Sequence, residues 1–183
     1  LPDNDVTVET DENFKTKIIC EKAKFDISGK SGEDFSYLPY IEKTDFISVS
    51  QFNLKEIIKQ TIFSISDNEN NKMMTGELFE VRNNMLKVVS LDGHRVSIRN
   101  LELKESYADR KVIVPGKTLM EVSKILSGEM EDLVHIFFTR NHIVFEFDET
   151  TVVSRLIEGE YFRIEQMLSS DYETKVKVNK KEL

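Results

Sequence analysis

Hydrophobic and polar residues alternate with a repeat of two along the first thirty positions of the chain. The alternation covers Val6–Thr10, Phe14–Cys20 and Lys24–Ser28, and it is typical of strands that bury one face. Turn-forming residues at 11–13 separate the first two segments, and residues 28–32 follow the third. The sequence therefore predicts three short strands joined by tight turns.

A helical repeat begins near residue 50, where Ser50 and Asn53 are candidate N-caps. Hydrophobic positions then recur at intervals of three and four, which predicts an amphipathic helix. Its stripe consists of Leu54, Ile57, Ile58, Thr61, Ile62 and Ile65. A second helix is predicted after Pro115, with Gly128 as its C-cap. The stripe of this second helix consists of Leu119, Val122, Ile125 and Leu126.

Strand patterns fill most of the chain between and after these helices. They cover Glu77–Val81, Met85–Leu91, Val96–Leu101, Lys111–Val114, Leu133–Thr139, His142–Asp148 and Thr150–Ile157. Hairpin turns are predicted at Asn83-Asn84, Asp92-Gly93 and Arg140-Asn141. The last of these turns pairs Thr139 with His142 and places His135 opposite Glu146. The fold class is therefore α+β, with antiparallel sheets and two helices.

Three domains or parts of domains are expected along the chain. Residues 35–39 predict an extended exit from the first strand set, and the acidic stretch at 41–45 is a candidate boundary. Residues 1–44 resemble the end of one strand set, and 45–168 form a complete α+β unit. Residues 169–183 predict a linker and the first strand of a further unit, near Lys175–Val178. No exact internal repeat is present.

Composition restricts the compartment and the partners. A single cysteine, Cys20, cannot form an internal disulfide, which fits a reducing cytoplasm and a role as a small core residue. No apolar run reaches the ~18 residues of a membrane span, and the N-terminus lacks both an initiating Met and a signal peptide. We therefore expect a cytoplasmic protein, present here as a fragment, with no membrane partner.

Candidate catalytic and metal-binding sets are incomplete in this sequence. The histidines are His94, His135 and His142, and their expected register does not pair the last two for a metal. No zinc-protease, phosphate-loop or nucleophile-elbow motif is present. We expect no catalytic residue, no metal and no cofactor. An enzyme that uses His94 with a nearby carboxylate is the weaker alternative.

Basic residues on the two predicted helices offer a nucleic-acid surface in an otherwise acidic chain. The net charge of the chain is −8, which opposes general DNA affinity because phosphate contacts need Lys and Arg. Each helix nevertheless carries a small positive excess, and its lysines share one face. These lysines are Lys55 and Lys59 on the first helix, and Lys117 and Lys124 on the second. The alternative is an ordinary solvated helix face.

A second candidate site is the turn between Leu91 and Val96. It presents His94 and Arg95 between apolar neighbours, and Met74 could lie alongside. A shallow apolar pocket with a basic rim suits a short peptide with hydrophobic anchors. The alternative is a hairpin with a basic pair on the surface.

Six segments resemble, in order, motifs of the bacterial DNA polymerase III beta sliding clamp family. Residues 91–96, Leu-Asp-Gly-His-Arg-Val, are similar to the family's "TDGHRL" signature. The other five resemble "FPxLP" at 35–39, "LkxxIxxTxF" at 54–63, "LtGvlfE" at 74–80, "viVPgKtL" at 112–119 and "SrLIeGxyP" at 154–161. These matches run through nearly the whole chain.

The resemblance implies a DNA-clamp fold and a non-catalytic function. Family members have three similar domains, in each of which two helices pack on one face of the sheets, and they close as a homodimeric ring around double-stranded DNA. The helices line the hole, so Lys55, Lys59, Lys117 and Lys124 are implied to face DNA without reading its sequence. The chain would hold a fragment centred on the middle domain. Implied partners are the DNA polymerase III alpha subunit, the clamp loader and other proteins with clamp-binding motifs.

The resemblance also implies a peptide pocket between the second and third domains. Carried over by position, its residues are Met74, Leu91, Gly93, His94, Arg95, Val96, Phe162, Gln166 and Met167. Leu91 stands where threonine is usual, Phe162 replaces proline, and Gln166 replaces a residue that is basic in some members. The functional alternative is a β-rich interaction domain without a DNA role.

Overall fold

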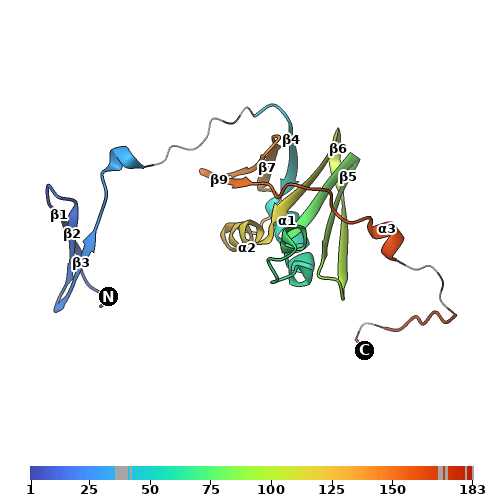
Figure 1. Ribbon diagram of the computed structural model, residues 1–183, viewed down its shortest axis with the longest axis horizontal. Coiled ribbons are helices and arrows are strands. Elements are labelled where there is room, and N and C mark those ends of the chain that lie inside the picture. The colour runs from blue at the N-terminus through green and yellow to red at the C-terminus, as the bar shows by residue number, and fades with distance from the viewer. Residues whose placement is uncertain (36–40, 42, 169–170, 172, 180, 183) are drawn as a thin grey trace. The chain divides into compact units, whose positions relative to one another are not determined.

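The computed structural model describes residues 1–35, 41, 43–168, 171, 173–179, 181 and 182 (Figure 1). The chain divides into two compact units, Leu1–Tyr40 and Ile41–Leu183. The boundary expected between residues 44 and 45 lies near this division. Most of the extended exit expected at 35–39 falls outside the described residues.

The first unit contains a three-stranded antiparallel sheet with β2 in its centre. Its strands are β1 (Thr7–Thr10), β2 (Lys15–Cys20) and β3 (Ala23–Ser28), so the three expected strands are present. A single 3-10 turn, η1 (Gly32–Asp34), follows them. Cys20 is 1% exposed, in agreement with its expected place as a small buried residue.

Four strands of the second unit form an antiparallel sheet in the order β4-β7-β8-β9. Their bounds are Phe46–Ser50 for β4, Leu133–Phe138 for β7, His142–Phe147 for β8 and Thr150–Arg155 for β9. His135 pairs with Glu146, and the Thr139 N–H donates to the His142 carbonyl at 3.0 Å. The register expected from the two-residue turn at Arg140-Asn141 is therefore confirmed.

Two long strands, β5 (Gly76–Leu91) and β6 (Val96–Pro115), pair antiparallel on the other side of the core. The four separate strands expected here were wrong in their bounds, because the assigned strands run on through the polar positions between them. The expected turn at Asp92-Gly93 is present, since Leu91 pairs with Val96 across it.

The strand β5 bends back on itself near Asn83, where a reversal was expected (Figure 1). Asn83 has a φ of 51°, and the register with β6 shifts on both sides of it. A straight strand would separate Glu77 from Ser90 by roughly 43 Å. Both residues instead lie beside Thr61, to whose carbonyl the Ser90 hydroxyl donates at 2.6 Å. The two halves of β5 therefore run side by side.

The first helix, α1 (Gln51–Thr61), forms where the three- and four-residue repeat predicted it. Ser50 is its N-cap, and the Ser50 hydroxyl accepts the Asn53 N–H at 3.2 Å. The expected stripe extended to Ile65, but the chain tightens into a 3-10 turn, η2 (Ile62–Ser64), after Thr61. A further 3-10 turn, η3 (Lys72–Thr75), leads into β5.

The second helix, α2 (Gly116–Ile125), ends earlier than expected. Gly128 was expected to cap it, but Leu126 is the capping residue and adopts an extended conformation. The Leu126 side chain is 2% exposed, so its burial in the core turns the chain away before Gly128 is reached. Gly128 itself adopts a left-handed backbone conformation, with a φ of +86°, which favours glycine.

The main hydrophobic core lies between the two helices and strands of both sheets. It includes Leu54, Ile57 and Ile58 of α1, Leu119 and Val122 of α2, and inward residues of β4, β5, β7 and β8. Apolar burial of this kind supplies most of the stability of a domain. A smaller second cluster lies on the other face of β5 and consists of Leu78, Val89, Leu91, Ile113, Tyr161 and Ile164.

The C-terminal part of the second unit contains one short helix, α3 (Ile164–Met167). The strand expected near Lys175–Val178 is not formed: residues 174–179 belong to neither a helix nor a strand. A strand needs a neighbour to satisfy its backbone hydrogen bonds, and no strand pairs with this segment in the described part of the chain. Among the described residues, no helix has the length and hydropathy needed to cross a bilayer.

Candidate functional site

The two helices lie side by side and antiparallel, as contacts at both ends show. At one end, the Lys55 ammonium of α1 lies 2.7 Å from the Leu126 carbonyl just after α2. At the other end, Gly116 opens α2 directly against Ile65, which follows α1. A Cβ on Gly116 would lie 2.4 Å from the Ile65 Cδ1 atom, so glycine permits this close approach.

The expected DNA-facing lysines fall into two groups. Lys59 and Lys124 have side chains that are 76% and 65% exposed, and Lys117 is exposed at the start of α2. Lys55 is half-buried and donates to the Leu126 carbonyl, where a cation also suits the C-terminal end of the helix dipole. Three of the lysines therefore remain available to a ligand, whereas Lys55 joins the two helices.

The exposed lysines are only weakly neutralised. Lys59 pairs with Glu56 at 3.8 Å, and Lys124 pairs with Glu121 at 2.7 Å, each on its own helix. Exposed pairs of this kind contribute about 0.2–1 kcal/mol, so a phosphate can compete for either lysine. Lys117 lines a cavity of about 300 Å³ together with Lys72 of η3.

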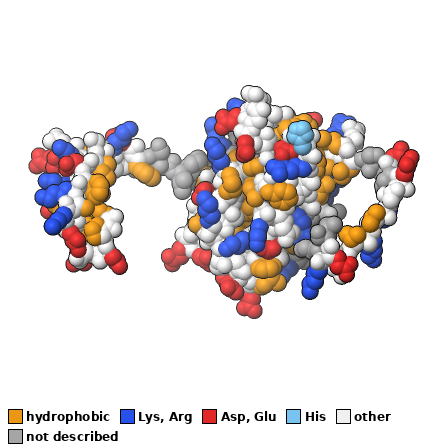
Figure 2. All heavy atoms as spheres, turned by 90° about the horizontal axis from the view of Figure 1, so that it is seen from below, with side chains coloured by type: hydrophobic (Ala, Val, Ile, Leu, Met, Phe, Trp, Pro, Cys, Tyr) orange, Lys and Arg blue, Asp and Glu red, His pale blue; other side chains and the backbone are white. Residues whose placement is uncertain are grey.

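Hydrophobic side chains separate the basic ones on the helices. Phe52 of α1 and Met120 and Ile125 of α2 are exposed. Figure 2 shows basic side chains spread over the visible face of the larger unit, with hydrophobic and acidic side chains among them. Such a surface attracts a polyanion without offering the dense positive patch of a tight DNA binder.

Four of the expected pocket residues meet in the second hydrophobic cluster. Leu91 is fully buried at the end of β5, and Met74, Val96 and Phe162 pack around the cluster while remaining partly exposed. The structure thus brings together residues from η3, from both long strands and from the segment after β9. The result is an apolar floor with partly open edges.

The turn beside this floor is ordered by Asp92. Its Oδ1 atom accepts the N–H groups of His94 and Arg95 at 3.0 and 3.1 Å, and its Oδ2 atom accepts Arg95 Nε at 2.9 Å. The backbone N–H of His94, with further help from Arg95, holds the pKa of Asp92 below its usual value. Gly93 has a φ of +91°, which this turn requires. His94 and Arg95 are therefore exposed in a fixed turn.

Phe63, Tyr161 and Asp92 belong to this region but were missed by the sequence reasoning about the pocket. The Arg95 guanidinium lies 5.9 Å from the centroid of the Phe63 ring, which is 57% exposed. Tyr161 is buried and packs edge-on against the Phe162 ring. Phe63 could have been found, because it closes the "LkxxIxxTxF" segment without contributing to the helix stripe.

Gln166 and Met167 lie on α3, and both are exposed. The short helix is held by Ile164, which is buried in the second cluster, and by the pair between Lys87 and Glu165 at 2.8 Å. The Lys87 ammonium lowers the pKa of Glu165. Neither Gln166 nor Met167 is part of the apolar floor in this chain.

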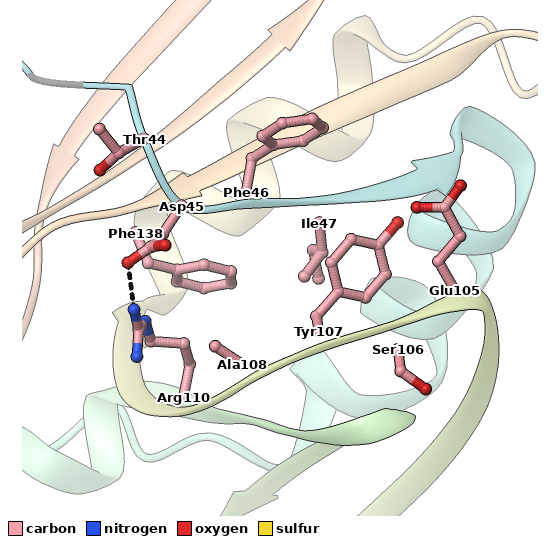
Figure 3. A pocket seen from close by; sticks show the side chains of 10 residues that line it. All are labelled: Thr44, Asp45, Phe46, Ile47, Glu105, Ser106, Tyr107, Ala108, Arg110 and Phe138. Carbon is pink, nitrogen blue, oxygen red and sulfur yellow. Dashed lines mark hydrogen bonds and ion pairs between the residues drawn. The ribbon is translucent and has the colours of Figure 1, made fainter.

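A separate cavity of about 310 Å³ lies between the start of β4 and the middle of β6 (Figure 3). The ion pair between Asp45 and Arg110 crosses one end, and Tyr107 and Glu105 lie at the other. The Ser48 N–H donates to the Tyr107 hydroxyl at 3.4 Å. None of the expected site residues lies in this cavity.

The described residues contain no group of three His, Cys, Asp or Glu side chains placed to hold a metal ion. His135 shares a hydrogen bond of 2.9 Å with the Ser48 hydroxyl and lies against Phe46. His94 is exposed on its turn, and its backbone is held by Asp92. His135 is thus held within a strand by its neighbours, and His94 belongs to a turn that Asp92 orders.

Two antiparallel helices against antiparallel sheets, with exposed lysines on the helices, define a domain of the DNA-clamp class. Residues 48–162 match the family model of the DNA polymerase III beta subunit, central domain. The chain is 34% identical over 179 residues to the beta sliding clamp of Staphylococcus aureus. The chain belongs to the DNA polymerase III beta subunit family, the bacterial sliding clamps.

Solved structures agree with this assignment. A DNA polymerase III beta subunit from Eubacterium rectale superposes with a TM-score of 0.81 at 68% identity, over 94% of this chain and 47% of that one. The sliding clamp from Bacillus subtilis superposes with a TM-score of 0.79 at 31% identity, over 91% of this chain and 44% of that one. The match to the S. aureus clamp covers 98% of this chain and 47% of the relative. The chain thus spans about half the length of these relatives.

Proposed function

We propose that the protein is a sliding clamp that encircles double-stranded DNA and keeps the replicative polymerase on its template. The observation that carries this proposal is the antiparallel pair α1 and α2, with Lys59, Lys117 and Lys124 exposed on the helices. A duplex inside a ring would meet separate lysines on helices and no groove-reading element. The protein would therefore be a processivity factor in the cytoplasm and not a catalyst.

In this mechanism the hold on DNA is topological. A closed ring leaves DNA only by opening or by sliding off an end, so its local attraction for phosphate can be weak. The net charge of −8 favours such sliding, since an acidic exterior discourages DNA from wrapping around the outside. The few lysines on the helices then supply attraction without sequence preference.

The ring would be a homodimer of three-domain subunits. We infer that residues 45–168 are the middle domain, that 1–44 are the last strands of the first domain, and that 169–183 begin the third. The three-stranded sheet of the first unit supports this division, because its hydrophobic residues Val8, Phe25 and Ile27 are exposed within that unit. A sheet face of this kind is stable only when further strands or helices cover it.

The apolar floor around Leu91 would dock short peptide motifs. Its partners would be the DNA polymerase III alpha subunit, the clamp loader and other proteins that carry clamp-binding motifs. Met74, Val96 and Phe162 supply apolar contacts around Leu91. His94 and Arg95 supply a basic rim, and the exposed Gly93 belongs to the same turn. Gln166 and Met167 would join from α3 only if that helix shifts when a peptide binds.

The topological mechanism is tested on the full-length protein with circular and linear DNA. Clamps loaded onto closed circular DNA should stay bound through gel filtration, and they should be lost once a restriction enzyme linearises that DNA. Linear DNA with both ends blocked by bound protein is the matched control and should retain the clamp. Equal loss from circular and linear DNA would remove the mechanism.

The pocket is tested by peptide affinity. The double variant His94→Ala with Arg95→Ala should weaken binding of a labelled peptide carrying the clamp-binding motif of the polymerase alpha subunit. A matched control, Arg99→Ala with Lys104→Ala, removes exposed basic residues from β6 outside the pocket. The pocket is misplaced if the two double variants bind the peptide equally well.

A further inference from the structure

The carboxyl group of Glu77 is buried near the start of β5, inside the second unit. Glu77 is 0% exposed, and neither of its carboxyl oxygens has a hydrogen-bond partner. An ionised carboxylate in such a place would have no compensation for lost hydration. A glutamate that stays here is therefore held as the neutral acid, and its proton is linked to the surrounding structure.

Four elements surround this carboxyl group. Thr61 at the end of α1 lies beside it, Ser90 in the second half of β5 contacts Thr61, and Val114 of β6 pairs with Glu77 in the sheet. From the segment after β9, the Tyr161 hydroxyl lies near enough for the Glu77 charge to act on its pKa, and it is also buried without a hydrogen-bond partner. The titratable group opposite Glu77 is thus a tyrosine, and its other polar neighbours are hydroxyls.

Burial raises the pKa of Glu77 to about 8. The Thr61 hydroxyl offsets this rise only in part, because its hydrogen is already donated to the Ile57 carbonyl at 2.8 Å. Burial, with the Glu77 charge as a second cause, also raises the pKa of Tyr161. Both groups are therefore neutral together, and ionisation of Glu77 places a charge whose field acts on the tyrosine.

These neighbours are joined directly to the proposed peptide pocket. Ser90 precedes Leu91, the buried centre of the apolar floor, and Tyr161 precedes Phe162, which packs on its edge. Tyr161 and Ile164 are the two buried residues through which the segment 161–167 is fixed to that floor. A change at the Glu77 carboxyl thus reaches the pocket through adjacent residues.

We propose that Glu77 is a proton-linked device that controls how the segment 161–167 seats against the peptide pocket. This inference rests on the proposed peptide-docking function. With the proton bound, the neutral carboxyl group tolerates the packed tyrosine, and the apolar floor is complete. With the proton lost, the charge is relieved when Tyr161 withdraws and admits water, which carries Phe162 and α3 away from the floor.

The segment around Tyr161 is the element that yields, because it has the fewest backbone constraints. Glu77 itself lies in a paired strand, where Gly76 through Val81 are matched with partners on β6. Residues 158–163 belong to no strand or helix, and α3 is a helix of only 4 residues. Local openings occur first where packing alone holds the chain.

The first arm of the test follows the segment itself by hydrogen–deuterium exchange in the 183-residue chain. Protection of amides 161–167, normalised to the β8 amides, should fall roughly tenfold between about pH 7 and about pH 9, since the neutral form drops to about a tenth. Glu77→Gln should remove this fall, and Glu105→Gln on exposed β6 should keep it. Glu77→Met serves as a second uncharged variant if the amide packs poorly.

The second arm measures peptide affinity in the full-length protein over the same range, with the labelled alpha-subunit peptide. Wild type should bind roughly ten times more weakly at the higher pH, and Glu77→Gln should bind equally at both. Equal pH dependence of the exchange in wild type and Glu77→Gln, or of the affinity for a peptide that does bind, overturns the device. If the peptide fails to bind at every pH while the exchange result holds, the docking function fails and the proton linkage stands.

Discussion

The ammonium group of Lys55 lies 2.7 Å from the carbonyl oxygen of Leu126, and this contact ties the start of α1 to the end of α2. The carbonyl is one that the end of α2 leaves without an internal partner. The Lys55 side chain also covers Gly128, where an added Cβ would lie 3.5 Å from the lysine Cδ atom. One of the four lysines assigned to DNA from the sequence therefore has a structural contact that the others lack.

The first prediction separates these two roles. Lys55→Met should lower the free energy of unfolding by roughly 1 kcal/mol, because a charged hydrogen bond to a helix end is lost. Lys59→Met, which removes an exposed lysine from the same helix, should change it by less than about 0.5 kcal/mol. Urea denaturation of both variants measures the difference. Equal stability of the two would show that the Leu126 contact contributes nothing.

The second prediction concerns the three exposed lysines of the helices. The triple variant Lys59→Ala, Lys117→Ala, Lys124→Ala should weaken binding of non-specific duplex DNA by the loaded clamp. The slope of log affinity against log salt concentration should become shallower by up to about 3, since each phosphate contact contributes about 0.9 to it. The triple variant Arg99→Ala, Lys104→Ala, Lys111→Ala has the same charge change on β6 and should leave the slope unchanged. Equal slopes would mean that the helices do not face DNA.

The fold was predictable where a local repeat coincided with a buried face. Leu54, Ile57 and Ile58 recur at helical spacing because one side of α1 meets the core, so sequence alone indicated the helix. The pairing of His135 with Glu146 followed from a two-residue turn, because such a turn fixes the register of both strands. These features depend on neighbours in the chain.

Features that depend on distant neighbours could not be predicted. Gly128 has the residue type of a helix cap, but burial of the Leu126 side chain ends α2 first. Glu77 stands in a strand pattern as a polar residue, and nothing local indicates that it is buried and interacts with Tyr161. The role of Lys55 likewise needs the packing of α1 against α2. Family resemblance located the apolar floor around Leu91, yet it gave no sign of the acid beneath it.

The third prediction is a pH dependence of stability caused by Glu77. Its pKa is about 8 in the folded chain against a reference value of 4.5, so the folded state binds the extra proton between these values. Stability is therefore highest below the lower value, falls as the pH rises towards 8, and then levels off. The loss should amount to roughly 3 kcal/mol by neutral pH. Glu77→Gln should abolish this part of the slope in denaturation curves, and an unchanged slope would contradict the assignment.

The fourth prediction tests the close contact at the start of α2. Gly116→Ala should destabilise the chain by about 1–3 kcal/mol, because its Cβ would meet Ile65 Cδ1 at 2.4 Å and the Thr75 carbonyl oxygen at 2.9 Å. Gly32→Ala is the control, since a Cβ there meets nothing within 4 Å. Thermal denaturation compares the two variants. A stable Gly116→Ala variant would show that the helix can move away from Ile65 at little cost.

The last prediction concerns the turn that presents Arg95. Asp92→Ala removes the acceptor of two backbone N–H groups and of the Arg95 guanidinium, so the basic rim should lose its fixed orientation. Affinity for the labelled alpha-subunit peptide should fall several-fold, because an ordered rim costs less entropy on binding. Asp109→Ala, an equal charge change at an exposed site on β6, should leave affinity unaltered. Since the neighbouring N–H groups hold the pKa of Asp92 below its usual value, acidification should weaken the peptide complex only as the pH falls through that lowered value, and the Asp92→Ala variant should lack this acid limb. A peptide that binds both variants alike would place its anchors on the apolar floor alone, with no contribution from the turn.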